Sequence, residues 1–137
     1  MIGLDHVGLS VADLDAAADF YGRAFGFERE HAFALGVDGI RGVMLLHAPS
    51  GGRLELFSRP ALVDPGVAGR TPIETIGYGG FGHVALTAPE LDATFARALD
   101  AGAVARVPPS PSPEPGVRFA FVADPEGNLV ELVGRGA

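Results

Sequence analysis

The sequence contains an internal duplication in which each copy carries one histidine and one glutamate. The first copy opens with LDHVGL and closes with RLELF, whereas the second opens with FGHVAL and closes with LVELV. His6 and His83 are 77 residues apart, and Glu55 and Glu131 are 76 apart, so both pairs keep nearly the same register. Two similar modules related by a pseudo-twofold axis can build a four-ligand metal site from these residues.

The hydrophobic periodicity predicts a β-α-β-β-β order for each copy. In the first copy, Asp13 is a predicted N-cap, and apolar residues at helical spacing continue to a stop at Gly26. The second copy repeats the pattern up to a final hairpin. We therefore predict an α+β chain of two β-α-β-β-β modules, with helices at 15–25 and 91–99 and strands at 4–11, two within 27–47, 53–57, 82–87, 104–107, 117–123 and 128–133.

The size of the duplicated units predicts a single domain over residues 1–137. Each copy alone is marginal in size, but the whole chain, with 47% hydrophobic residues, can bury a substantial core. We place module one at 1–57, a Pro- and Gly-rich connector at 58–80 and module two at 81–137. A connector of this length is often functional. The proline-rich segment 108–116 is predicted to be a stiff, extended loop.

The composition excludes several classes of function. A net charge of −7 argues against nucleic-acid binding, which requires a basic face. There is no lysine for Schiff-base chemistry and no cysteine for thiolate chemistry or disulfides. No apolar run reaches the roughly 20 residues of a membrane helix, and no signal-like leader is present. We therefore expect a cytoplasmic protein that binds neither membranes nor nucleic acid.

The four duplicated residues are candidate metal ligands. Glu55 and Glu131 lie in apolar strands, where a buried carboxylate is costly unless it is paired, hydrogen-bonded or metal-bound. Two imidazoles and two carboxylates suit one divalent ion of zinc, nickel, cobalt, manganese or iron. The alternative is that His6 and His83 are hydrogen-bonded core residues and that the glutamates pair with arginines, specifically Arg53 or Arg118. His31 and His47 have no counterparts in the second copy and are predicted to be non-ligands.

The sequence resembles the vicinal-oxygen-chelate superfamily, also called the glyoxalase/bleomycin-resistance/dioxygenase superfamily. The resemblance is carried by LDHVGLSVADLDAAADFYGRAFGF, GRLELF, GHVALTAPELDATFARALDAGA and FVADPEGNLVELV. It implies paired β-α-β-β-β modules that form a curved open barrel around a metal ion. The superfamily's ligand positions fall on His6, Glu55, His83 and Glu131. Members are commonly dimers, so a homodimer is expected.

The ligand set resembles that of glyoxalase I-like enzymes, which carry His or Gln followed by Glu, His and Glu. This resemblance implies a metal-dependent lyase or isomerase, glyoxalase-like or epimerase-like, acting on a small carbonyl substrate through a metal-bound enediolate or enolate. Glu131 or Glu55 is the implied catalytic base, and the resemblance favours Glu131. Epimerase-like members resemble this chain less at the position of Glu55, where they carry glutamine.

Two other functions within the superfamily remain open. Iron(II) extradiol-type dioxygenases resemble a site that uses the positions of His6, His83 and Glu131, in which Glu55 would be a superfluous charge. A metal-free protein that binds a small molecule such as an antibiotic is the second alternative, although such members usually lack the ligand set. The residue at position 55 therefore separates a lyase-like site from an oxygenase-like one.

Overall fold

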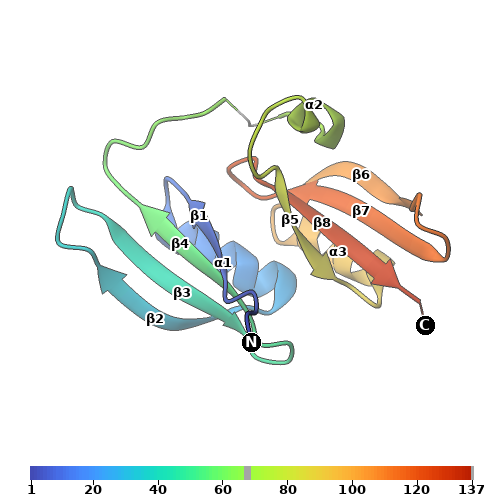
Figure 1. Ribbon diagram of the computed structural model, residues 1–137, viewed down its shortest axis with the longest axis horizontal. Helices are drawn as coiled ribbons and strands as arrows, with labels where there is room; N and C mark the ends of the chain where they lie inside the picture. The colour runs from blue at the N-terminus through green and yellow to red at the C-terminus, as the bar shows by residue number, and fades with distance from the viewer. Residues whose placement is uncertain (67–68, 137) are drawn as a thin grey trace. The chain divides into compact units, whose positions relative to one another are not determined.

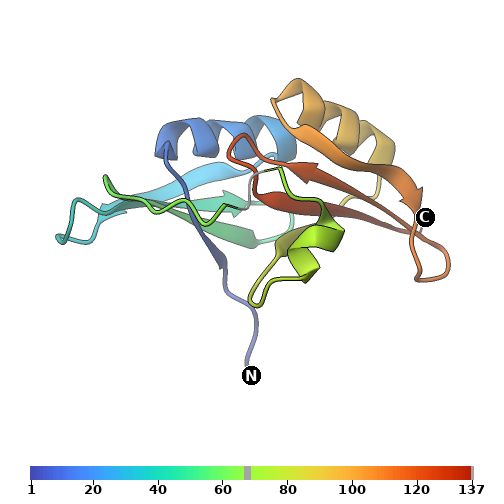
Figure 2. The same cartoon turned by 90° about the horizontal axis from the view of Figure 1, so that it is seen from above.

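The computed structural model describes residues 1–66 and 69–136, which form two compact units, Met1–Asp64 and Pro65–Ala137. Each unit contains an open four-stranded mixed sheet with a long helix on one face (Figures 1 and 2). The predicted α+β class and the β-α-β-β-β order of each module are confirmed. The first unit comprises β1 (Val7–Ser10), α1 (Leu14–Phe25), β2 (Glu28–Ala34), β3 (Arg41–His47) and β4 (Gly52–Ser58).

The second unit repeats this arrangement after a short helix in the connector. The elements are α2 (Pro72–Ile76), β5 (His83–Thr87), α3 (Leu91–Asp100), β6 (Val104–Pro111), β7 (Val117–Ala123) and β8 (Leu129–Arg135). The sheet of this unit has the strand order β5-β8-β7-β6, which matches the order β1-β4-β3-β2 of the first unit. In both sheets the first and last strands of the module pair in parallel, and the other neighbours are antiparallel.

Local sequence sets the ends of α1. The Asp13 carboxylate accepts a hydrogen bond from the backbone N–H of Ala16 at 3.0 Å, which satisfies one of the free donors of the first turn. Gly26 ends the helix in the left-handed conformation, with φ of 82°. Glycine adopts this conformation without the steric cost that a Cβ would add. Both predicted helix ends are therefore confirmed.

Each helix covers only one face of its sheet. In β4 the side chains of Leu54 and Leu56 are buried, as are Phe20 and Tyr21 of α1, and together they form the core of the first unit. Because side chains alternate along a strand, Glu55 lies on the face opposite α1. The second unit is built in the same way, and its most deeply buried residues include Val122, Val130, Leu132, Ala98 and Ala120.

The proline-rich segment differs from its prediction. Residues 108–111 continue β6 instead of forming a loop, and only 112–116 form the connection to β7. The strand tolerates its prolines because β6 is an edge strand, whose outer side needs no backbone N–H donors.

The connector contains α2, a short helix capped by Thr71, which its Pro- and Gly-rich sequence did not predict. No helix in the described part of the chain is long and apolar enough to span a lipid bilayer.

The two long helices provide a matched test of N-capping. Replacing Asp13 with alanine should lower the free energy of unfolding by about 1 kcal/mol, because the N–H of Ala16 loses its acceptor. Glu90, the N-cap of α3, makes no side-chain capping hydrogen bond, so Glu90→Ala should have a smaller effect. Urea denaturation measures both variants, and equal losses would contradict this account of α1.

Candidate metal-binding residues

In the first unit, the parallel pairing of β1 with β4 brings His6 to Glu55. The pairing sets Gly8 beside Glu55, and His6 lies two residues before Gly8 on the same face. The His6 Nε2 atom is 3.1 Å from the Glu55 Oε1 atom. The two side chains are 33% and 21% exposed, so the pair is partly shielded yet open to a ligand.

The other ring nitrogen of His6 contacts a residue that the sequence did not single out. The His6 Nδ1 atom is 2.7 Å from the Asp5 Oδ2 atom. This hydrogen bond raises the pKa of His6, and the negative charge of Glu55 raises it further. The same hydrogen bond lowers the pKa of Asp5 below the usual value for aspartate. The signal in the sequence was an acidic residue directly before the histidine of only one copy.

The second unit forms the equivalent pair. The β5–β8 pairing sets Ala85 beside Glu131, and the His83 Nε2 atom lies 3.3 Å from the Glu131 Oε1 atom. These side chains are 39% and 23% exposed. The ring of Phe121 packs edge-on against His83, with 5.0 Å between ring centroids. The position that matches Asp5 is occupied by Gly82, which has no side chain to contact the imidazole.

Aromatic residues share the strand faces that carry the two pairs. In the first unit, Phe57 lies two residues beyond Glu55 on the same strand, and Phe33 meets it edge to face at 5.7 Å. In the second unit, Phe119 and Phe121 make a similar contact at 6.0 Å. Each His–Glu pair therefore has aromatic side chains among its neighbours.

The structure bears on the alternative in which arginines neutralise the glutamates. The Arg53 guanidinium donates to both carboxylate oxygens of Glu30, at 3.1 and 3.0 Å. Arg118 donates to Asp92 instead. Glu55 and Glu131 instead pair with the two predicted histidines.

The structure thus brings the four predicted residues together as two pairs. Within residues 1–66 and 69–136, no group of three or more His, Asp or Glu side chains is placed to hold a metal ion. The four-ligand centre therefore stays a prediction. The donor atoms of each pair nevertheless fit an ion, because two ligands bound at right angles about 2.1 Å from a metal lie roughly 3 Å apart.

The remaining histidines have other contacts. The ring of His31 stacks on Phe33, with 5.8 Å between ring centroids. The His47 Nδ1 atom is 2.6 Å from the Ser50 Oγ atom in the β3–β4 turn. These contacts are consistent with the prediction that neither histidine is a ligand.

Known proteins share this fold. The family model of the Glyoxalase/Bleomycin resistance protein/Dioxygenase superfamily matches residues 3–132. No curated protein matches the chain. Among solved structures, glyoxalase I from Zea mays is 20% identical with a TM-score of 0.76, covering 97% of this chain and 44% of that one. The chain therefore spans less than half the length of the maize enzyme.

Two bacterial structures match over nearly their whole length. A glyoxalase family protein from Bacillus cereus is 19% identical with a TM-score of 0.79, covering 97% of this chain and 93% of that one. A glyoxylase/bleomycin resistance protein/dioxygenase domain from Frankia sp. EAN1pec is 19% identical with a TM-score of 0.76, covering 100% and 99%. At these identities the likeness establishes the fold.

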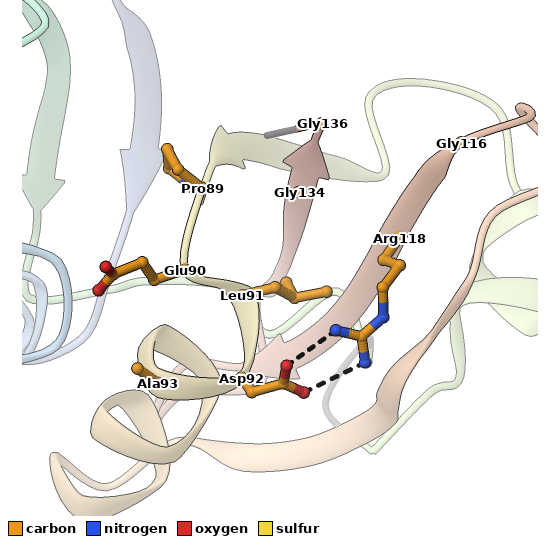
Figure 3. Close-up of a pocket in the computed structure, with 9 residues that line it drawn as sticks. All are labelled: Pro89, Glu90, Leu91, Asp92, Ala93, Gly116, Arg118, Gly134 and Gly136. Carbon is orange, nitrogen blue, oxygen red and sulfur yellow. Dashed lines mark hydrogen bonds and ion pairs between the residues drawn. The ribbon is translucent and has the colours of Figure 1, made fainter.

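A separate hollow of about 410 Å³ lies at the start of α3 (Figure 3). In this hollow the Arg118 guanidinium donates two hydrogen bonds to the Asp92 carboxylate, with nitrogen–oxygen distances of 2.8 and 3.2 Å. Phe121 of β7 lies beside Glu131 of β8, and side chains alternate between the two faces of a strand. Arg118 therefore projects from the face opposite Phe121 and Glu131. None of the four predicted ligands lines this hollow.

The Asp92–Arg118 pair predicts a pH-dependent contribution to stability. The hydrogen bond from Arg118 lowers the pKa of Asp92 in the folded chain. The contribution is therefore complete above the usual carboxyl pKa and is lost as the pH falls through the lower, folded value.

Asp92→Asn should destabilise the protein more at neutral than at acidic pH, as measured by urea denaturation across that range. In an Arg118→Ala background this pH dependence should vanish. If it persists there, another group causes it.

Proposed function

The chain belongs to the Glyoxalase/Bleomycin resistance protein/Dioxygenase superfamily, and we propose that it is a divalent-metal-dependent lyase or isomerase acting on a small carbonyl substrate. One observation carries the proposal. The duplicated sequence yields two His–Glu pairs with donor separations of 3.1 and 3.3 Å, each on the sheet face that its helix leaves uncovered. A purely structural role would not require the same pair at equivalent places in both modules.

In this proposal His6, Glu55, His83 and Glu131, within one chain or across a swapped dimer, hold one divalent ion of zinc, nickel, cobalt, manganese or iron. The donor set is suitable, because imidazole nitrogens and carboxylate oxygens both bind these metals. When bound, the ion supplies positive charge that stabilises the oxyanion developing on a substrate carbonyl. The carboxylate of Glu55 favours this chemistry over an extradiol-type site. In such a site His6, His83 and Glu131 would be the ligands, and the charge of Glu55 would be superfluous.

Glu131 is the proposed base. On a substrate with a hydroxyl on the carbon beside the carbonyl, the Glu131 carboxylate takes the proton from that carbon. The electron pair of the C–H bond becomes the C=C bond of an enediolate, and the π pair of the carbonyl moves onto its oxygen. Return of the proton to the former carbonyl carbon, with the hydroxyl proton moving to the other oxygen, completes an isomerisation. The neighbours of Glu131 across the sheet, Ala85 and Phe121, are apolar. Glu55 is the alternative base.

The proposal extends to the assembly and its setting. We propose one domain over residues 1–137, a cytoplasmic protein and a homodimer. The dimer is supported by the edge strands that both open sheets present, β1 and β2 in one and β5 and β6 in the other.

Metal binding provides the first test. We expect the purified full-length chain to bind Zn²⁺ or Co²⁺ stoichiometrically, with the predicted glutamates among the ligands. Glu55→Gln and Glu131→Gln should each weaken binding by more than the roughly 10–100-fold typical of outer-shell changes. Glu28→Gln, which removes an equal charge from the exposed strand β2, should bind as the wild type does. Failure of the wild type to bind either ion, as measured by competition with a chromogenic chelator, would refute the proposal.

Proton exchange tests the chemistry. With the hemithioacetal of methylglyoxal as the probe, the metal-loaded protein should incorporate deuterium from heavy water beside the carbonyl, as followed by NMR. Glu131→Gln should slow this exchange by about 10²–10⁴-fold, the usual contribution of a general base. Oxygen uptake with a catechol by the iron-loaded protein would indicate ring cleavage instead. Tight ligand binding that chelators leave unchanged would indicate a metal-free binding protein.

A further inference from the structure

The imidazole of His6 lies between two carboxylates that determine which of its nitrogens carries hydrogen. Its Nδ1 atom is 2.7 Å from Asp5 Oδ2, and its Nε2 atom is 3.1 Å from Glu55 Oε1. An ionised carboxylate can only accept a hydrogen bond. In the neutral ring, the shorter contact assigns the hydrogen to Nδ1, which donates to Asp5 and leaves a lone pair on Nε2.

In the neutral ring, this arrangement directs the Nε2 lone pair of His6 toward Glu55. With Nδ1 protonated, the Nε2 lone pair faces a carboxylate oxygen at 3.1 Å, so two acceptors oppose each other. Such a contact is repulsive until a positive charge, either a proton or a metal ion, lies between the two atoms. The contact with Asp5 therefore prepares this pair for an ion.

The second histidine lacks this constraint. Gly82 precedes His83 and has no side chain, and the polar contact of the His83 ring is with Glu131 at 3.3 Å. Neutral His83 can therefore carry its hydrogen on Nε2 and donate it to Glu131, which satisfies both groups without a cation. The two copies share their ligands but differ in the residue that orients the imidazole.

We propose that Asp5 is a positioning residue of the metal site. It holds the hydrogen of His6 on Nδ1 and so directs the Nε2 lone pair toward Glu55 and the ion. This inference rests on the proposed function, because it assigns His6 as a ligand. Metal-bound histidines commonly donate their second N–H to a carboxylate, which fixes the tautomer and the ring orientation. The Asp5 side chain is 79% exposed, so its substitution leaves the core intact.

The tautomer of His6 gives a test that does not depend on activity. The metal-free full-length chain is labelled with ¹⁵N in histidine and kept in alkaline buffer. Two-bond nitrogen–proton NMR spectra then distinguish the neutral Nδ1–H form of each imidazole from the neutral Nε2–H form. We expect His6 to carry its hydrogen on Nδ1 in the wild type and to shift toward the Nε2–H form in Asp5→Ala. The control is Asp100→Ala, which removes an exposed carboxylate from the end of α3 and should leave the His6 tautomer unchanged. An unchanged tautomer in Asp5→Ala would overturn the inference.

Metal affinity completes the test. Asp5→Ala should bind Zn²⁺ about 10–100-fold more weakly than the wild type, with unchanged stoichiometry, whereas Asp100→Ala should match the wild type. Equal Zn²⁺ affinity of Asp5→Ala and the wild type would overturn the role of Asp5 alone and leave the proposed function standing. Absence of Zn²⁺ binding in the wild type would refute both the role of Asp5 and the proposed function. Circular dichroism confirms that each variant is folded.

Discussion

The parallel pairing between the first and last strands of each module is the contact on which the candidate site depends. The β1–β4 and β5–β8 ladders join residues that are distant in sequence, and they set each histidine beside its glutamate. A slip of one residue in either register would turn the glutamate toward the helix, because side chains alternate between the two faces of a strand. Leu54 and Leu56 of β4 and Val130 and Leu132 of β8 oppose such a slip, since these buried side chains would then turn to the other face.

The helices account for the free face of each sheet. Both α1 and α3 pack their apolar sides on one face, where Leu56 and Leu132 are fully buried. The opposite face is left for the polar pairs and for aromatic residues such as Phe57 and Phe121. One arrangement of helix on sheet thus produces both a stable core and a partly exposed His–Glu pair.

The agreement between prediction and structure is closest where local signals and packing coincide. Asp13 and Gly26 marked both ends of α1 because capping depends on only a few neighbouring residues. The strand that runs through Pro108 was not expected, because proline opposes strands in general and is accepted only where the outer edge is free. The short helix α2 was missed because a Pro- and Gly-rich composition favours turns.

The sequence by itself determined the duplicated modules and the four candidate ligands, because these follow from periodicity and from repeated residue types. Its motifs carried the resemblance to the superfamily. Tertiary structure decided which candidate ligands meet, since the separation between His6 and Glu55 depends on strand register rather than on spacing along the chain. It also distinguished two histidines that the repeat makes equivalent. Asp5 contacts the ring of His6 at 2.7 Å, whereas the matching glycine cannot contact His83 through a side chain. The contact between a side chain and a neighbouring histidine ring is a three-dimensional property that the repeat does not encode.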